Sequence, residues 1–312
     1  MSAGPTFRVA QAEDIRPVYR MFRRSIFAYL HRIGLATAEE ASSPPVESAW
    51  KRQSDWIGHL WATAAENWVA TDQAGAIIGW ALSVERSRHL ELAFFFVDPE
   101  HGARGVGSHL LDLAFTSRPE TKKTIMATQD PSALALYLRT GLRFVATACD
   151  IRVTGRRVAP GTDLVFRRIG DGPADLAVIA GIEERLIGLC READLRFLAG
   201  NRPGWIALRD GRPVGYAFGA QPTPADATDF PPTCGPAAAL DAADLPALID
   251  VVINAAPAGS DLYFAVPLAN QRAVSHLLRL GGRIDPFYIA VLSTWPGMAL
   301  DRYIHTAPSF IV

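Results

Sequence analysis

Residues 94–108 combine an apolar run, a loop of small residues and the start of an amphipathic helix. The apolar run ends at Val97, and the loop leads directly into the helix. Such a junction aims free backbone N–H groups and the positive end of a helix at one point, which suits a pyrophosphate. Gly105 and Gly107 let a ligand approach the backbone because no Cβ atom blocks it. Arg104 adds a cation for charge-assisted contacts with phosphate.

Two common phosphate-binding motifs do not fit this loop. A dinucleotide-binding fingerprint needs G-x-G-x-x-G early in a βαβ unit and an acidic residue about twenty positions further on. Here the loop follows the fourth expected strand, and no suitable acid ends the next strand. A Walker A loop needs a Gly-Lys-Ser/Thr ending, which is absent. The alternative to a phosphate-binding loop is a tight turn that binds no ligand.

The expected elements of the first half place this loop between a strand and a helix. Strands are expected over residues 6–11, 67–71, 77–85, 89–97, 124–128 and 143–153, and helices over residues 12–33, 50–66, 104–117 and 132–140, with a loop at residues 41–45. Three consecutive strands can form an antiparallel meander, whereas the later helical crossovers call for parallel pairing. We therefore expect an α/β (α+β) fold with a mixed, mostly antiparallel sheet flanked by helices.

The second half of the chain weakly repeats the first. The segments Asn67-Trp68-Val69-Ala70 and Gly79-Trp80-Ala81 are echoed by Gly204-Trp205-Ile206-Ala207 and Gly215-Tyr216-Ala217, at offsets of 136 to 137 residues. Phe7-Arg8 with residues 12–15 is echoed by Phe166-Arg167 with residues 173–176. Ordered agreement at a nearly constant offset predicts a duplication. We place the domains at residues 1–158 and 159–312; chance matches in an Ala-rich chain are the alternative.

Composition excludes several classes of function. The chain has 312 residues, which suits two domains, and its net charge of −1 gives no global attraction to nucleic acid or an anionic membrane. The N-terminus lacks a basic region followed by an apolar run, so we expect no secretory signal and a cytoplasmic location. The three cysteines are widely spaced and resemble neither a disulfide framework nor a metal cluster.

Two motifs carry a resemblance to a known family. The stretch V-D-P-x-x-x-x-R-G-V-G at residues 97–107 resembles motif A of the GNAT superfamily of N-acyltransferases. Residues 130–142 resemble the motif that follows in that family, commonly N-x-x-A-x-x-x-Y-x-x-x-G-F. The family's usual Gln or Arg at the start of the loop is Gly102 here, and its usual Asn is Asp130. The order of strands and helices in residues 1–155 is also similar to that fold.

The resemblance implies two tandem GNAT-like domains, with acetyl-CoA as the acyl donor and no metal. It implies that acetyl-CoA or CoA contacts Phe95, Phe96, Val97, Gly102, Ala103, Arg104, Gly105, Val106, Gly107, Ser108, Asp130, Ala133 and Tyr137. It also implies direct attack of an amine on the thioester, with the backbone N–H of Val97 stabilising the oxyanion. The helices over residues 16–66 would cover the acceptor, and their aromatic residues either enclose it or pack on the sheet.

The resemblance assigns the two proton transfers. Tyr137 occupies the position of the family's general acid, and a core tyrosine is the alternative. Glu91 lies eleven residues before Gly102 and matches the general-base glutamate of histone-acetylating members. A glutamate is disfavoured inside an apolar strand unless it is useful or paired, although Glu91 could also be a charge at a strand start. Glu85 and His89 are weaker candidates for the base, and we expect His89 at the surface.

The second half has lost these motifs. Residues 234–246 contain neither V-x-P nor G-x-G, and Asp241 and Asp244 would repel phosphate. Leu277 stands seven residues after Asn270, where a tyrosine would be needed. We therefore expect a degenerate, non-catalytic second domain that contains a long loop at residues 221–236.

Three functions stay open at this point. The leading one is N-acetyl transfer to a primary amine of a small molecule or peptide, by a monomer or homodimer. The second is a non-catalytic acyl-CoA-binding sensor or regulatory module. The third is a tRNA-dependent aminoacyl transferase, which would require a basic face that the charge balance does not predict.

Overall fold

The computed structural model describes residues 4–102, 105–116, 120–155, 158–159, 161–170, 172–220 and 233–306. The first half forms one α/β unit. Its elements are β1 (Thr6–Val9), η1 (Ala12–Asp14), α1 (Ile15–Arg32), α2 (Ala38–Ser42), α3 (Val46–Ala62), β2 (Ala64–Thr71), β3 (Ile77–Arg86), β4 (His89–Val97), η2 (Pro99–His101), α4 (Val106–Ala114), β5 (Lys122–Thr128), α5 (Pro131–Arg139) and β6 (Arg143–Thr154).

The second half repeats this order. Its elements are β7 (Val165–Arg168), α6 (Pro173–Ile187), α7 (Glu192–Asn201), β8 (Gly204–Arg209), β9 (Arg212–Phe218), β10 (Thr233–Cys234), β11 (Ala237–Ala239), η3 (Ala242–Asp244), α8 (Leu245–Ala255), β12 (Asp261–Pro267), α9 (Gln271–Arg279), β13 (Arg283–Ser293), η4 (Leu300–Arg302) and β14 (Tyr303–Ile304). The predicted loop at residues 41–45 is wrong in part, because Thr37 caps the short helix α2. Residues 221–232 of the expected long loop lie outside the described residues.

The repeated sequence segments have the same strand register. In the first unit Trp68 lies opposite Ala81, and in the second unit Trp205 lies opposite Ala217. The turn after each first strand is also the same. Arg8 pairs with Asp14 at 2.5 Å, and the corresponding pair is Arg167 with Asp175 at 2.7 Å. The short echoes in the sequence therefore correspond to equivalent positions in two copies of one fold.

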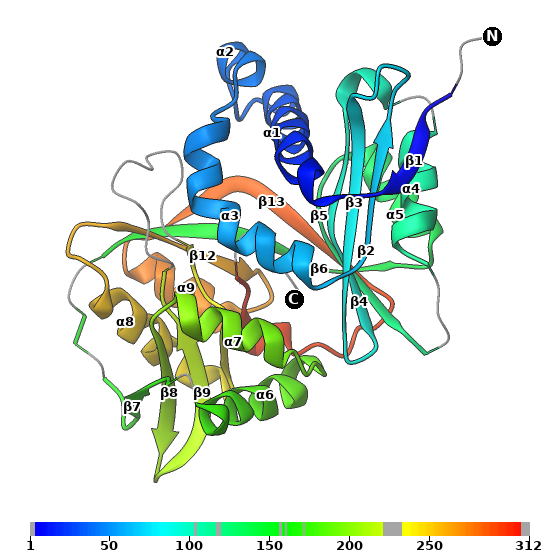
Figure 1. Ribbon diagram of the computed structural model, residues 1–312. Helices are drawn as coiled ribbons and strands as arrows, with labels where there is room; N and C mark the ends of the chain where they lie inside the picture. The colour runs from blue at the N-terminus through cyan, green and yellow to red at the C-terminus, as the bar shows by residue number, and fades with distance from the viewer. Residues whose placement is uncertain are drawn as a thin grey trace.

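The two units share a sheet. Nine strands lie in the order β1-β2-β3-β4-β5-β13-β6-β12-β10, and a second sheet has the order β14-β11-β9-β8-β7. The last long strand of each unit is thus hydrogen-bonded to the other unit: β13 pairs with β5, and β6 pairs with β12. Figure 1 shows β6 and β13 crossing the middle of the molecule. Among the described strands, only β4–β5 and β10–β12 pair in parallel, as the predicted mixed, mostly antiparallel sheet requires.

Apolar side chains cover both faces of the shared sheet. Helices α1 and α3 pack on one face through Val18, Ile57 and Trp56, in a cluster that also includes Leu186 and Tyr303 of the second unit. Helices α4 and α5 pack on the opposite face in a separate cluster with residues of β4 and β5. Because one core spans both units, we expect them to unfold together.

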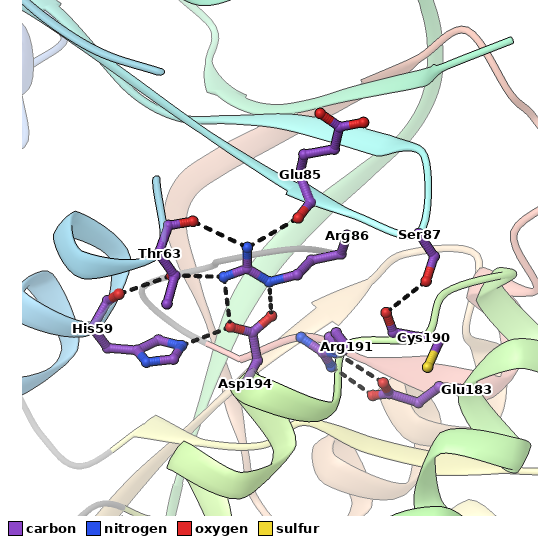
Figure 2. Close-up of polar contacts among 9 residues, drawn as sticks. All are labelled: His59, Thr63, Glu85, Arg86, Ser87, Glu183, Cys190, Arg191 and Asp194. Atoms are coloured by element: carbon purple, nitrogen blue, oxygen red, sulfur yellow. Dashed lines mark hydrogen bonds and ion pairs between the residues drawn. The ribbon is translucent and has the colours of Figure 1, made fainter. Parts of the chain in front are cut away.

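A buried polar cluster also joins the units (Figure 2). The carboxylate of Asp194 in α7 accepts hydrogen bonds from Arg86 Nε (2.8 Å) and Nη2 (2.9 Å) and lies 2.6 Å from His59 Nε2. Burial alone would raise the pKa of Asp194, but the hydrogen bonds from His59 and Arg86 lower it to about 2. This cluster fixes α3 and the end of β3, and thereby one wall of the first unit, against the second.

Candidate functional site

The strands β4 and β5 separate after their first three residues. They pair only through His89 to Glu91 and Lys122 to Thr124. A β-bulge follows, because Ser83 lies opposite Leu92 whereas Leu82 lies opposite Phe94. A bulge bends its strand and increases the local twist, and the rest of β4 accordingly stays paired with β3 alone. Two strand edges with free backbone groups therefore face a gap between β4 and β5.

The backbone of Val97 points into this gap. The N–H of Asp98 donates to the carbonyl of Ile78 in β3 at 2.8 Å. Because backbone N–H groups of successive strand residues point to opposite edges, the N–H of Val97 points away from β3. The carbonyl of Val97 accepts a hydrogen bond from Ser25 Oγ of α1 at 3.2 Å, which holds the strand end against that helix. The N–H thus points into the gap, and its predicted role as a donor to an oxygen atom there stays a prediction.

The glycine loop brings the N-terminus of α4 to the mouth of the gap. Gly105 caps the helix with φ +74°, a left-handed conformation that favours glycine. The first-turn N–H groups of Val106, Gly107 and Ser108 have no acceptor within the helix. A Cβ on Gly107 would lie 3.4 Å from Phe95 and 3.6 Å from Val97, so this turn packs on the end of β4. The arrangement can hold an anion beside the gap.

Other predicted loop residues have less specific positions. Gly102 has right-handed helical backbone angles, which any residue adopts, and an added Cβ would meet only the Pro99 carbonyl at 3.8 Å. Ala103 and Arg104 lie outside the described residues. The ring of Phe96 lies 4.6 Å from that of Phe22, on the α1 face of the sheet, whereas Phe95 and Val97 face α4 and α5.

Tyr137 lies beneath the gap. It is 4% exposed, and its ring meets that of Phe95 edge-on at 5.7 Å. Burial, with the nearby charge of Asp130 as a smaller cause, raises the pKa of Tyr137 well above its usual value. The phenol therefore stays protonated at neutral pH and can donate a hydrogen bond to an acceptor in the gap.

Asp130 and Ala133 position the helix that carries Tyr137. One oxygen of Asp130 accepts hydrogen bonds from the N–H groups of Ser132 (2.9 Å) and Ala133 (3.0 Å), and so caps α5. Its other oxygen forms an ion pair with Arg32 of α1. Asp130 therefore caps α5 and connects it to α1.

Glu91 lies at the closed end of the gap. It is 1% exposed and sits opposite Val84, whose side chain belongs to the core on the α1 face. Its neighbour His89 was expected at the surface, and this prediction is wrong. His89 is fully buried, with Nε2 2.5 Å from Thr124 Oγ1. Burial lowers the pKa of His89 to about 4, so the imidazole is neutral and a poor base at neutral pH.

Sequence reasoning missed two carboxylates on the same face. Asp150 of β6 is two residues from Ala148, which packs in the α1-face core, whereas Cys149 faces the second unit's helices. Opposite Asp150, the ladder to β13 is interrupted between Ile284 and Tyr288, where Asp285 lies. Oδ1 of Asp150 is buried without a hydrogen-bond partner among the described residues. Burial and then the charge of Asp285 raise the pKa of Asp150 to about 6. An aspartate in the apolar run at residues 144–153 was the available signal.

The aromatic residues of α1 and α3 mostly form core. Tyr19 is fully buried and Trp56 is 3% exposed, and both pack in the α1-face cluster. Tyr29, near the end of α1, instead meets Phe287 of the interrupted part of β13, with ring centroids 6.3 Å apart. The packing interpretation therefore holds for most of this face, and Tyr29 with Phe287 forms an aromatic edge close to Asp285.

Neither a metal centre nor a membrane span is found in the described part of the chain. Within those ranges, His, Cys, Asp and Glu side chains form no group of three or more suited to a metal ion. No described helix has both the length and the apolar character needed to cross a bilayer.

Comparison with known proteins finds one family model that matches part of the first unit. Residues 35–142 match the acetyltransferase (GNAT) family model. Similar solved structures include a candidate acetyltransferase from Pyrococcus horikoshii (12% identity, 97% of this chain and 94% of that one, TM-score 0.68) and a GCN5-related N-acetyltransferase from Sphaerobacter thermophilus (15%, 96% and 98%, TM-score 0.64). A tandem GNAT protein from the clavulanic acid biosynthesis pathway matches at 16% identity over 93% of this chain and 98% of that one, with TM-score 0.56. No curated protein matches the chain in sequence. The tandem fold predicted from the sequence is confirmed.

Proposed function

We propose that this chain transfers an acetyl group from acetyl-CoA to a primary amine of a small molecule or peptide, and the match of residues 35–142 to the acetyltransferase (GNAT) family model supports this. The observation that carries this proposal is the gap between β4 and β5. It combines the inward N–H of Val97, the free N-terminus of α4 and the buried phenol of Tyr137. These groups suit the carbonyl, the pyrophosphate and the sulfur of one extended thioester.

The donor side requires three contacts. The first turn of α4, from Val106 to Ser108, would bind the pyrophosphate through backbone N–H groups and the helix dipole. The free edge of β4 would bind the amides of the pantetheine arm, and the N–H of Val97 would polarise the thioester carbonyl. Phe95 and Gly107 form an apolar floor between these two positions.

The acceptor attacks by a direct route in a ternary complex. The amine nitrogen forms a bond with the carbonyl carbon and gives up one proton, for which we propose Glu91 as general base, acting through water because the side chain is buried. The carbon–sulfur bond then breaks, and the leaving thiolate takes the proton of Tyr137. The thiol, with an unperturbed pKa of about 8.5, is a stronger acid than the phenol, so Tyr137 would stabilise the developing thiolate by a hydrogen bond and give up its proton only as the carbon–sulfur bond breaks.

The acceptor face favours a cationic amine. Asp150 faces the same side of the shared sheet as Glu91, and the charge of Asp285 acts on it. A bound ammonium would relieve the repulsion between the two carboxylates. The acceptor would enter from this face, opposite the helices α4 and α5.

The test is a calorimetric titration of acetyl-CoA into the intact protein, followed by turnover measurements with an amine panel. Binding of one acetyl-CoA per chain with micromolar affinity, and CoA release that depends on an added amine, is the expected result. Absence of binding would refute the donor site.

A non-catalytic acyl-CoA sensor is the second candidate, and the burial of Glu91 is the observation that favours it. In that case acetyl-CoA would bind normally, but no amine would accelerate the release of CoA. Turnover on any amine of the panel would exclude the sensor.

A further inference from the structure

The second unit contains the same strand separation as the first. Its fourth strand is divided: β10 pairs in parallel with β12, and β11 leaves β12 and pairs with β9. In the first unit, the early part of β4 likewise pairs with β5 and the later part only with β3. The gap between β11 and β12 is therefore the counterpart of the gap between β4 and β5.

The chain itself fills the second gap. Tyr303 and Ile304 pair with Ala238 and Ala237 of β11, and the N–H of His305 donates to the carbonyl of Ala265 in β12 at 2.9 Å. A segment of three residues thus bridges both strand edges. Among the described residues of the first unit, no strand takes this place between β4 and β5.

Side chains around the second gap hold this segment from its two ends. Residues 303–306 are at most 1% exposed. Asn270, the cap of α9, donates from Nδ2 to the carbonyl of Tyr303 at 3.0 Å. Arg202 Nη1 donates to Thr306 Oγ1 at 3.2 Å and to the carbonyl of Gly235 at 2.6 Å. The segment is therefore fixed through backbone and side-chain contacts that fit an extended peptide.

The hydroxyl of Tyr303 reaches a fully buried ion pair. Arg191 Nη2 donates to this hydroxyl at 2.7 Å and also bonds to Glu183; Figure 2 shows the pair of Arg191 and Glu183. Tyr216 completes the cluster by donating to Glu183 at 2.5 Å. Because buried charges are costly without full hydrogen bonding, loss of the Tyr303 contact would leave Arg191 under-satisfied.

Gly235 makes room for the segment. It has φ +119°, and a Cβ atom there would collide with the carbonyl oxygen of His305. Gly211 also has a positive φ of +73°, but a Cβ there would meet nothing within 4 Å. Both glycines have a positive φ, but only a Cβ at Gly235 would collide with the C-terminal segment. Substitution of each by alanine therefore gives a test and a matched control.

We infer that the second gap is a strand-binding site whose ligand is residues 303–306 of the same chain, in the position that corresponds to the pantetheine arm in the first gap. The pantetheine arm carries amides that bond to strand edges as a peptide does. The second unit is thus closed to acyl-CoA by its own C-terminal strand, and each chain offers one donor site. The comparison with pantetheine rests on the proposed function, whereas the occupancy of the second gap does not.

The test uses the full chain with a protease recognition sequence inserted between Pro296 and Gly297, which are exposed and precede η4. The protein is folded, cleaved and passed through gel filtration. We expect the released C-terminal fragment to co-elute with the body at monomer mass. We expect Gly235→Ala to speed its dissociation by about 10-fold and Gly211→Ala to leave the dissociation rate unchanged.

Three results would overturn the inference. The fragment could leave a folded body immediately, or Gly235→Ala could retain it as well as Gly211→Ala does. A dimeric mass for the complex would assign the strand to a second copy instead. If Gly235→Ala fails to fold, hydrogen exchange at the His305 amide of the unmodified protein decides, because unprotected exchange would refute the contact with Ala265. A titration with acetyl-CoA on the same cleaved sample separates the two proposals: fragment retention without acetyl-CoA binding would refute the donor site alone.

Discussion

The two gaps of this molecule share a backbone and differ in what fills them. Between β4 and β5, the edges face a glycine loop and the phenol of Tyr137. Between β11 and β12, the edges pair with Tyr303 to His305, and Leu277, buried in an apolar cluster, occupies the position of the tyrosine. The separation of the strands is therefore a property of the fold. Cofactor binding requires in addition a glycine loop and a strand edge that no other segment of the chain occupies.

The caps of α5 and α9 also share their local geometry and differ in their further contacts. Asp130 and Asn270 both accept hydrogen bonds from the N–H three residues later, and they cap α5 and α9 in the same way. The first cap is tied to Arg32 of α1, whereas the second donates to the C-terminal segment. The same type of helix cap thus holds α1 in the first unit and the C-terminal segment in the second.

The largest expected difference between the gaps concerns acetyl-CoA affinity. Gly107→Glu places a carboxylate at the first turn of α4, where it repels the pyrophosphate and crowds Phe95. We expect affinity to fall by about 1,000-fold, from micromolar to millimolar, while the protein stays folded. Ala243→Glu, exposed in the corresponding η3 turn of the second unit, is the matched control. Equal loss in both variants would show that the donor site has been assigned to the wrong gap.

The sequence predicted the first gap better than the second. Motif spacing located Val97, Gly107 and Tyr137 because loop and helix contacts there are local in the chain. The exchange of β6 and β13 between units was not predictable, since both strands read as equally apolar and pairing partners are set by tertiary packing. The position of residues 303–306 was not predicted either, because a strand of so few residues is too short to show periodicity. Loss of the glycine loop also predicts a second unit without donor chemistry, and this stays a prediction.

Next in size is a contrast between two buried tyrosines. Tyr137→Phe removes the proposed proton donor, and we expect kcat to fall by about 100-fold with unchanged affinity for acetyl-CoA. Tyr303→Phe removes a hydrogen bond to buried Arg191, and we expect a loss of about 1.5–3 kcal/mol in unfolding free energy with unchanged kcat. Steady-state kinetics and urea unfolding on both variants measure the contrast. If Tyr137→Phe lost stability and kept its turnover, Tyr137 would be a core residue like Tyr303.

Glu91→Gln probes the closed end of the first gap, and its effect depends on pH. We expect kcat/KM to fall by about 10- to 100-fold near pH 7, where the acceptor amine must lose a proton. The loss should shrink toward pH 10, because the amine then arrives deprotonated. Glu85→Gln, on the neighbouring strand and partly exposed, serves as the control. A pH–rate profile of Glu91→Gln parallel to that of the parent would remove Glu91 from this role.

The smallest expected effect concerns Asp150, for which the second unit offers the control Asp261. Asp150→Asn should raise KM for a diamine such as 1,5-diaminopentane by about 10-fold, and leave KM for propylamine and affinity for acetyl-CoA unchanged. Asp261→Asn should alter none of these, because Asp261 pairs with Arg152 at 3.1 Å on the neighbouring strand. Equal KM changes for both amines would show that Asp150 does not select a second positive charge.

Asp150 also predicts the pH dependence of stability, with the opposite sign to an ordinary ion-paired carboxylate. Its folded pKa of about 6 lies above the usual value for an aspartate, since burial and Asp285 disfavour the charge. The folded state therefore binds this proton more tightly, and its stabilising effect, complete below pH 4, is lost as the pH rises through 6. Asp150→Asn should consequently raise the unfolding free energy at pH 7 by about 1–3 kcal/mol and change it little at pH 4. The charged Asp150 lowers stability at pH 7, and a bound cationic substrate would offset this cost. Urea unfolding at the two pH values, set beside the diamine KM, tests both halves of that argument: a variant that loses stability at pH 7 would show that Asp150 is a structural residue.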